Sequence, residues 1–295
     1  MKLILRLSEF FIFTNIFLAA AVSSLVFETY IILYNHIIDF RYAFFLFCST
    51  LFIYCFHRVF RFSDRTGEEK GAIRHLWIKT NRRWFSSVLL FSVFGILLSI
   101  RYFVKWQTIL YLFPVAFVSL GYTVPFIPSS HGWIRLRDIP GVKIFLISLV
   151  FAFTTVFLPV FAYDDLYLFQ RPELVFIFFR RVLFIFSITI PFDIRDMDYD
   201  KEKNTKTIPL IFGAEYAKKM AVVALFIFIA AAVIQYFFIP YTNPYYIVAL
   251  ILSALVSVFL VMRTNAQRND YFYSFFMEGM MLLQCLLVFV AGMLN

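Results

Sequence analysis

Nine long apolar runs dominate this chain and limit what it can fold into. A helix of about 20 consecutive, mostly apolar residues crosses the hydrocarbon core of a bilayer. Soluble domains carry roughly 25% charged residues, whereas this chain of 295 residues has 15%. The sequence therefore predicts an all-α fold, a polytopic membrane helical bundle of about nine transmembrane helices. The predicted spans are 10–33, 43–62, 84–100, 106–121, 142–162, 172–192, 219–239, 245–262 and 271–294.

The positive charges indicate how this bundle is oriented. Cytoplasmic loops retain Lys and Arg. With the N-terminus inside, 21 of the 27 Lys and Arg residues fall in the inside segments and four in the outside segments. We therefore expect a multi-pass protein of the cell membrane with a cytoplasmic N-terminus. The net charge of +9 is then a topology signal that also attracts anionic headgroups. Membrane lipids, and no nucleic acid, are the expected partners.

The N-terminal segment allows two interpretations. In residues 1–24, Lys2 and Arg6 precede an apolar stretch, and "AAAVSS" offers a cleavage site of small residues, as in a signal peptide. The apolar run continues to Leu33, however, which is too long for the apolar region of a signal peptide. We expect an uncleaved first span.

The connections indicate one domain with its chemistry on one side. No linker rich in Gly, Ser or Pro divides the chain, so residues 1–295 are expected to form a single transmembrane domain. Three connections are long and polar, and all three fall on the cytoplasmic side: 63–83, 121–142 and 193–218. Functional residues concentrate in such loops.

The last of these connections is unusually acidic. It begins within "PFDIRDMDYDKEKNTKTIPLIFG", residues 191–213. If the preceding helix continues into it, a rotation of about 100° per residue places Asp193, Asp196 and Asp200 within about 60° of one another. Asp198 then points away. Like charges at this spacing repel, so we expect a cation on the shared face.

Two kinds of cation fit this acidic face. Carboxylates without Cys or His nearby favour a hard ion such as Mg²⁺ or Mn²⁺, which is typically shared with substrate phosphates. The alternative is a solvated helix end whose acids are neutralised by Lys201, Lys203 and Lys206.

The same stretch resembles the second aspartate-rich motif of the UbiA-type intramembrane prenyltransferases. In that family, Asp-x-x-x-Asp at the end of the sixth helix precedes a Thr-Leu-Pro-like segment and a Gly. Asp196 and Asp200 match the two aspartates, and Asp193 extends them. The tail is matched by Thr207, Pro209 and Gly213. Nine helices with the N-terminus inside are also the family's architecture, so the resemblance covers the whole chain. The stretch "LGYTVPFIPSSHGWIRLRDIPGVK" is similar to the family's loop after the fourth helix.

The resemblance implies a function and its residues. It implies an integral-membrane prenyltransferase that transfers a prenyl group from a polyprenyl diphosphate donor to a lipophilic acceptor at the cytoplasmic face. Mg²⁺ is the implied cofactor, with Asp193, Asp196 and Asp200 as metal ligands and catalytic residues that stabilise the leaving diphosphate. The loop after the fourth helix implies three groups that bind the donor: Tyr122, Arg137 and Lys143.

The family's first aspartate-rich motif is missing at the end of the second span. The stretch "LFIYCFHRVFRFSD", residues 51–64, offers His57, Arg58 and Arg61 on one helix face instead. These bases either contact the diphosphate oxygens directly or pair with the three aspartates and close the site without metal. The first interpretation predicts an enzyme with altered metal dependence. The second predicts a catalytically inactive relative that binds an isoprenoid or has a structural role. Simpler alternatives are an ordinary hydrogen bond for the histidine and positive-inside anchoring for the arginines.

Two arginines lie inside the sixth apolar run, where charge is costly. Arg180 and Arg181 either line a channel for the donor's tail or pair with acids of the preceding loop, or their side chains reach the outer surface of the membrane. We expect the last of these. The acids available for pairing are Asp164, Asp165 and Glu173.

Overall fold

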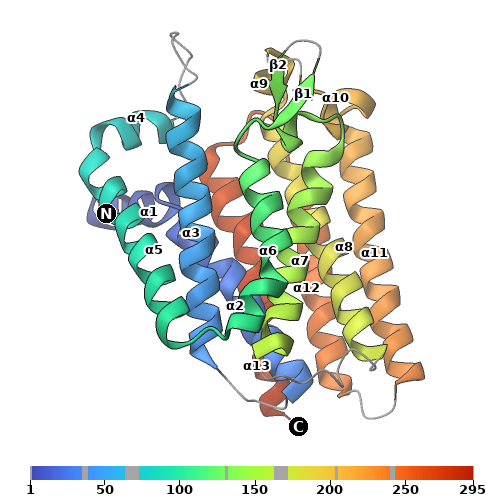
Figure 1. The fold of residues 1–295 in the computed structure, drawn as a ribbon. Coiled ribbons are helices and arrows are strands. Elements are labelled where there is room, and N and C mark those ends of the chain that lie inside the picture. The colour runs from blue at the N-terminus through green and yellow to red at the C-terminus, as the bar shows by residue number, and fades with distance from the viewer. Residues whose placement is uncertain are drawn as a thin grey trace.

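The chain folds into a bundle of long helices that run along one another (Figure 1). The computed structural model describes the backbone of residues 2–34, 39–63, 73–129, 132–162, 172–202, 205–239 and 243–294. It describes the side chains of the same residues except 2–6, 60–63, 73–76, 129 and 162.

The long helices of the described chain correspond to the nine predicted spans. Eight are long and apolar enough to cross a membrane, and α6, with 16 residues, is a shorter apolar helix. This confirms the predicted polytopic helical bundle. The helices are α2 (Ile16–Tyr34), α3 (Phe40–Ser63), α5 (Arg82–Tyr102), α6 (Trp106–Gly121), α7 (Val142–Ala162), α8 (Pro172–Arg195), α11 (Ala214–Phe238), α12 (Pro244–Met262), and α13 (Glu278–Met293) preceded by the π-helical turn η3 (Phe272–Met277).

The predicted start of the first span, at residue 10, is wrong, because the spanning helix begins at Ile16. Helix α1 (Lys2–Phe13) ends before α2 begins, and Asn15 adopts a positive φ of 65° between them. Asn enters the left-handed region at lower cost than most residues, so a helix break at this position is physically reasonable. The chain turns there, and α1 contacts α4 (Ile73–Thr80) beside the bundle (Figure 1).

Helix α2 lies at the centre of the packing. It contacts α3, α7 and α13. The remaining helices complete the bundle through pairs in which α3 packs on α5, α6 on α7, α7 on α8, α8 on α11, α11 on α12, and α12 on α13. Leu25, Phe184 and Phe228 are completely or almost completely buried in the largest apolar core cluster. Large apolar side chains such as Leu90 and Phe113 are exposed on the outside, as suits a surface in contact with lipid tails.

The short elements gather at one end of the bundle, opposite the C-terminus (Figure 1). They are the antiparallel strands β1 (Ile127–Ser129) and β2 (Gly132–Ile134), the 3₁₀ turn η1 (Leu136–Asp138), and the helices α9 (Met197–Glu202) and α10 (Ile208–Phe212). The backbone N–H of Gly141 donates to the carbonyl of Lys206 at 3.0 Å. The polar connections 121–142 and 193–218 therefore meet at this end.

Candidate active site

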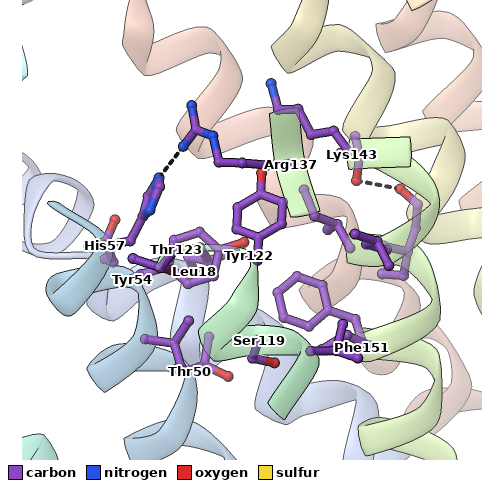
Figure 2. Close-up of a pocket in the computed structure, with 18 of the residues that line it drawn as sticks. Leu18, Thr50, Tyr54, His57, Ser119, Tyr122, Thr123, Arg137, Lys143 and Phe151 are labelled. Atoms are coloured by element: carbon purple, nitrogen blue, oxygen red, sulfur yellow. Dashed lines mark hydrogen bonds between the residues drawn. The ribbon is translucent and has the colours of Figure 1, made fainter. Parts of the chain in front are cut away.

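A cavity of about 1360 Å³ opens among α3, α6, α7 and α8 at the end that carries the polar connections. It exceeds the roughly 300–1000 Å³ of most small-molecule pockets. Figure 2 shows Thr50, Ser119 and Phe151 lying beyond Tyr122, farther from the charged groups at the mouth. Side chains such as Leu112 and Ile147 make this deeper part largely apolar. The lining includes eight predicted site residues: His57, Arg58, Tyr122, Arg137, Lys143, Asp193, Asp196 and Asp200. The side chain of Arg61 lies outside the described residues.

The wall formed by α8 and α9 carries the aspartates. The backbone N–H of Asp196 donates to the carbonyl of Phe192 at 3.0 Å, and that of Asp200 donates to the carbonyl of Asp196 at 2.8 Å. These bonds keep the chain on a helical path from α8 into α9. Asp193 and Asp200 are 1% and 2% exposed, whereas Asp198 is exposed. The two buried aspartates lie on the cavity side, but Asp198 also lines the cavity, so its expected direction away from the other three is not confirmed.

Lys143, at the start of α7, lies between these two carboxylates. Its Nζ is 2.5 Å from Asp193 Oδ1 and 3.7 Å from Asp200 Oδ2. Burial raises the pKa of Asp200, and the positive charges of Lys143 and Arg137 oppose this rise. The ammonium group therefore occupies the kind of position in which two carboxylates hold a cation.

Asp196 is held by a different cation. Arg195 donates from Nε to Asp196 Oδ1 at 2.8 Å and from Nη2 to Oδ2 at 3.2 Å. Its Nη1 lies 3.6 Å from Asp270 Oδ1, which also lines the cavity. Neither Arg195 nor Asp270 was expected at the site from sequence. The place of Arg195 next to Asp196 in the sequence is a signal that could have identified it.

The opposite wall is basic. Arg137 of η1 donates from Nη1 to His57 Nε2 at 2.8 Å, because a guanidinium can only donate. Tyr122 lies beside both, with its ring centroid 5.8 Å from the His57 ring and 5.8 Å from Arg137 Cζ. Figure 2 shows Arg137 turned towards His57. The connection 121–142 and α3 thus bring together three residues that the sequence predicted to bind the donor.

Arg58 has a structural role in addition to its place in the cavity wall. Its Nη1 donates to the carbonyl of Phe13 at 2.7 Å, and its Nη2 donates to Asn15 Oδ1 at 2.6 Å. These bonds hold the break between α1 and α2. The guanidinium therefore satisfies acceptors at the end of α1, an arrangement that the helical position of Arg58 did not indicate.

Residues 78–286 match the UbiA prenyltransferase family, which is 209 of the 295 residues. The chain belongs to this family. Its fold also resembles a solved structure of digeranylgeranylglyceryl phosphate synthase, with a TM-score of 0.59 and 14% sequence identity over 100% of both chains. That identity is low enough for the likeness to concern the fold alone. No curated protein matches the chain.

Membership of the UbiA family raises the question of whether the three aspartates are placed to hold a divalent metal ion. Asp193 and Asp200 converge on one cation, and Asp200 Oδ2 is buried without a hydrogen-bond partner among the described residues. That oxygen has capacity for a metal ion. The third carboxylate, Asp196, is turned to Arg195. Within the described part of the chain, no three Asp, Glu, His or Cys side chains are grouped closely enough to hold a metal. Two of the three predicted ligands, Asp193 and Asp200, are therefore placed to bind a cation between them.

A second charged group lies deeper in the UbiA-type bundle. Arg181 Nη2 is 3.1 Å from Glu28 Oε1, with side chains 1% and 2% exposed. Gln284 Nε2 donates to the same oxygen at 3.1 Å. The expectation that Arg180 and Arg181 reach the outer membrane surface is wrong. Arg180 is 4% exposed and donates from Nε to the carbonyl of Phe176 at 3.4 Å, and Glu28 of α2 provides a buried partner for Arg181. Asp164 and Asp165 lie outside the described residues.

Proposed function

We propose that this UbiA-family protein is a prenyltransferase acting on a polyprenyl diphosphate and a lipophilic acceptor at the cytoplasmic face of the membrane. The observation that carries the proposal is the cavity, which joins a largely apolar interior to a mouth lined by Lys143, Arg137 and the aspartates. An isoprenoid chain suits the apolar interior, and a diphosphate suits the charged mouth. The 21 Lys and Arg residues on the side of the N-terminus support the cytoplasmic orientation.

The reaction breaks the bond between the allylic carbon and a diphosphate oxygen, and the electron pair leaves with the diphosphate. The acceptor's nucleophilic atom then forms a bond to that carbon and loses a proton. Arg137 and Lys143 donate hydrogen bonds to the phosphate oxygens as negative charge develops on them. The apolar walls keep water from the allylic carbon.

Mg²⁺ fits this proposal as an ion held by Asp193 and Asp200, and Asp196, the third predicted ligand, would join them by giving up its bonds to Arg195. When bound, it would supply additional positive charge to the leaving diphosphate. Because Lys143 contacts two of these carboxylates, binding of the ion requires the lysine to share them or to turn towards the donor's phosphates.

The test is binding of a non-hydrolysable prenyl diphosphate analogue to the purified protein, with and without Mg²⁺. We expect binding that increases with Mg²⁺ and is lost in the double variant Asp196→Ala with Asp200→Ala. Glu215→Gln is a suitable control, since Glu215 begins α11 with a side chain that is 76% exposed and lies outside the cavity lining. Absence of binding under all metal conditions, in a folded protein, would refute the proposal.

The contact of Lys143 with Asp193 favours a second candidate function. An internal ammonium that neutralises the acidic wall suits a catalytically inactive relative that holds an isoprenoid without diphosphate chemistry. Such a protein would bind a prenyl alcohol as tightly as the diphosphate analogue. A preference for the diphosphate that depends on Mg²⁺ would exclude this candidate.

A further inference from the structure

One side of the cavity is not used by the contacts proposed for the donor. It is lined from the start of α2, from α3, and from the segment that leads from η3 into α13, and we call it the α13 side. The described side chains there include Asn15, Leu18, Tyr54, Met277, Glu278 and Met281. Figure 2 shows Leu18 and Tyr54 on the opposite side of Tyr122 from Lys143. Leucine and methionine make the α13 side largely apolar, and methionine adapts its shape to a ligand.

Glu278 places a buried acid on this α13 side. It is 9% exposed and lines the cavity. It belongs to the apolar span Phe272–Met293, where an ionisable side chain is costly and generally marks a functional site. Asp270, the other acid that this segment contributes to the described lining, is 3.6 Å from Arg195 at the mouth. Glu278 lies eight residues further into the bundle, so its carboxylate reaches an apolar part of the cavity.

The π-helical turn η3 sets the direction of Glu278. A π turn holds one more residue than an α-helical turn and occurs frequently at functional sites. It therefore shifts the register of all that follows it. Within the turn, Phe275 and Phe276 are 51% and 46% exposed. Met277, Glu278 and Met281, at its end and beyond it, line the cavity.

The charges near Glu278 connect it to the reacting end of the cavity. Glu278 is close enough to Arg195 and to Tyr54 to interact electrostatically with both. Arg195 donates to Asp196 Oδ1 at 2.8 Å, so one guanidinium separates Glu278 from the wall that carries the aspartates. An acceptor on the α13 side would therefore have its reactive group between Glu278 and the donor's allylic carbon.

We propose that Glu278 is a catalytic residue that binds a hydroxyl group of the acceptor and takes up its proton. The hydroxyl oxygen forms its bond to the allylic carbon with an electron pair, its O–H bond breaks, and the proton passes to a carboxylate oxygen of Glu278. The acceptor then belongs to the class of neutral, lipophilic hydroxyl compounds, because a carboxylate on it would be repelled by that of Glu278. This inference rests on the proposed function, since the acceptor attacks the carbon that the diphosphate leaves.

The first test compares two matched probes, a naphthol and the naphthoate with its carboxylate at the same ring position. Isothermal titration calorimetry measures the affinity of the wild-type protein for each, with the non-hydrolysable donor analogue and Mg²⁺ present. We expect the naphthol to bind at least about 10-fold more tightly, because only the naphthoate carries a charge of the same sign as Glu278. Equal affinities, or no binding of the naphthol, would overturn the inference. Failure of the donor analogue to bind under any metal condition would instead refute the proposed function.

The second test removes the charge of Glu278. Glu278→Gln keeps the size of the side chain and a carbonyl acceptor, so the preference for the naphthol should fall about 10-fold while the affinity for the donor analogue stays the same. Glu202→Gln is the matched control, because it makes the same change at an exposed acid of the lining, at the end of α9. A preference that persists in Glu278→Gln, or falls equally in both variants, would overturn the inference. If thermal unfolding shows that Glu278→Gln is not folded, the preference of the wild type decides.

The third test detects the proton transfer. A naphthol becomes a much stronger acid in its excited state, so a molecule bound beside a carboxylate loses its proton to it and emits light as the naphtholate. With the protein in excess over the probe, we expect naphtholate emission from the wild type and from Glu202→Gln, and mainly naphthol emission from Glu278→Gln. A carboxylate with only a structural role would not produce this difference. Identical emission spectra from the wild type and Glu278→Gln, with the probe bound to both, would overturn the catalytic role of Glu278.

Discussion

Two ion pairs in this bundle consist of similar groups but have different surroundings. Arg181 and Glu28 lie deep between α8 and α2, 3.1 Å apart, with side chains 1% and 2% exposed. Lys143 and Asp193 lie at the cavity mouth, 2.5 Å apart, and the lysine side chain is 16% exposed. The described lining of the cavity includes both residues of the second pair and neither residue of the first. A ligand can therefore reach one pair and not the other.

The contacts around each pair show what the difference means. Arg181 also donates to the carbonyl of Leu25 at 3.1 Å and to Thr155 Oγ1 at 3.4 Å, so one guanidinium joins α2, α7 and α8. Lys143 is shared between two aspartates at unequal distances, and the farther oxygen, on Asp200, has no described hydrogen bond. The deep pair is built to hold helices together, whereas the pair at the mouth can exchange partners.

Breaking the deep pair should have the largest effect. Arg181→Met leaves the carboxylate of Glu28 buried without its cation, and we expect a loss of about 3–5 kcal/mol in the free energy of unfolding. Unfolding in detergent micelles, followed by circular dichroism, measures it. The double variant Glu28→Gln with Arg181→Met should regain much of this stability, because no charge remains buried. A similar loss in Lys143→Met would contradict the contrast between the two pairs.

Removing charge at the mouth should affect binding more than stability. Asp200→Asn keeps the shape of the side chain but removes a buried charge that faces the cation site, and we expect about 100-fold weaker binding of the diphosphate analogue in Mg²⁺. Isothermal titration calorimetry measures the affinity. Glu215→Gln, at an exposed acid, should leave it unchanged. Loss of stability without loss of affinity would mean that the aspartate is structural.

Replacing the lysine at the mouth should change two affinities in opposite directions. Lys143→Gln removes the internal cation that competes for Asp193 and Asp200, so Mn²⁺ should bind the ligand-free protein about 10-fold more tightly, a difference of about 1.4 kcal/mol. The same change removes a donor to the phosphates, so the analogue should bind about 10-fold more weakly in metal-free buffer. Titrations with Mn²⁺ alone and with the analogue alone distinguish the two. Unchanged Mn²⁺ affinity would exclude competition by Lys143.

The sequence predicted the features that depend on length and periodicity. The nine spans follow from the lengths of the apolar runs, and the shared side of Asp193 and Asp200 follows from helical spacing within one segment. Contacts between distant segments have no such local signal. Arg181 and Glu28 belong to different helices that meet only in the packed bundle. The break at Asn15 was missed because one polar residue hardly changes the mean hydropathy of a long run.

The sequence predicted only part of what Lys143 does. Its general role near the donor could be expected from a family resemblance, but its contact with Asp193, 50 residues away along the chain, could not. That contact depends on how α7 packs against α8, which no local pattern specifies. Arg58 is similar, since its acceptors lie at the end of α1.

The smallest expected effect tests whether the deep pair depends on the hydroxyl groups around it. The hydroxyl of Thr29 donates to the backbone carbonyl of Thr155 at 2.9 Å. Its Oγ1 also lies 3.5 Å from Arg181 Nη2, from which it can accept a hydrogen bond. Thr29→Val keeps the shape and removes one acceptor of the guanidinium, so we expect a loss of about 1 kcal/mol in unfolding free energy. Thr154→Val is the control, because its hydroxyl bonds within its own helix, to Val150 at 2.8 Å. If both variants lose the same stability, the hydroxyl of Thr29 adds nothing to the contacts that Glu28, Thr155 and the Leu25 carbonyl make with the arginine.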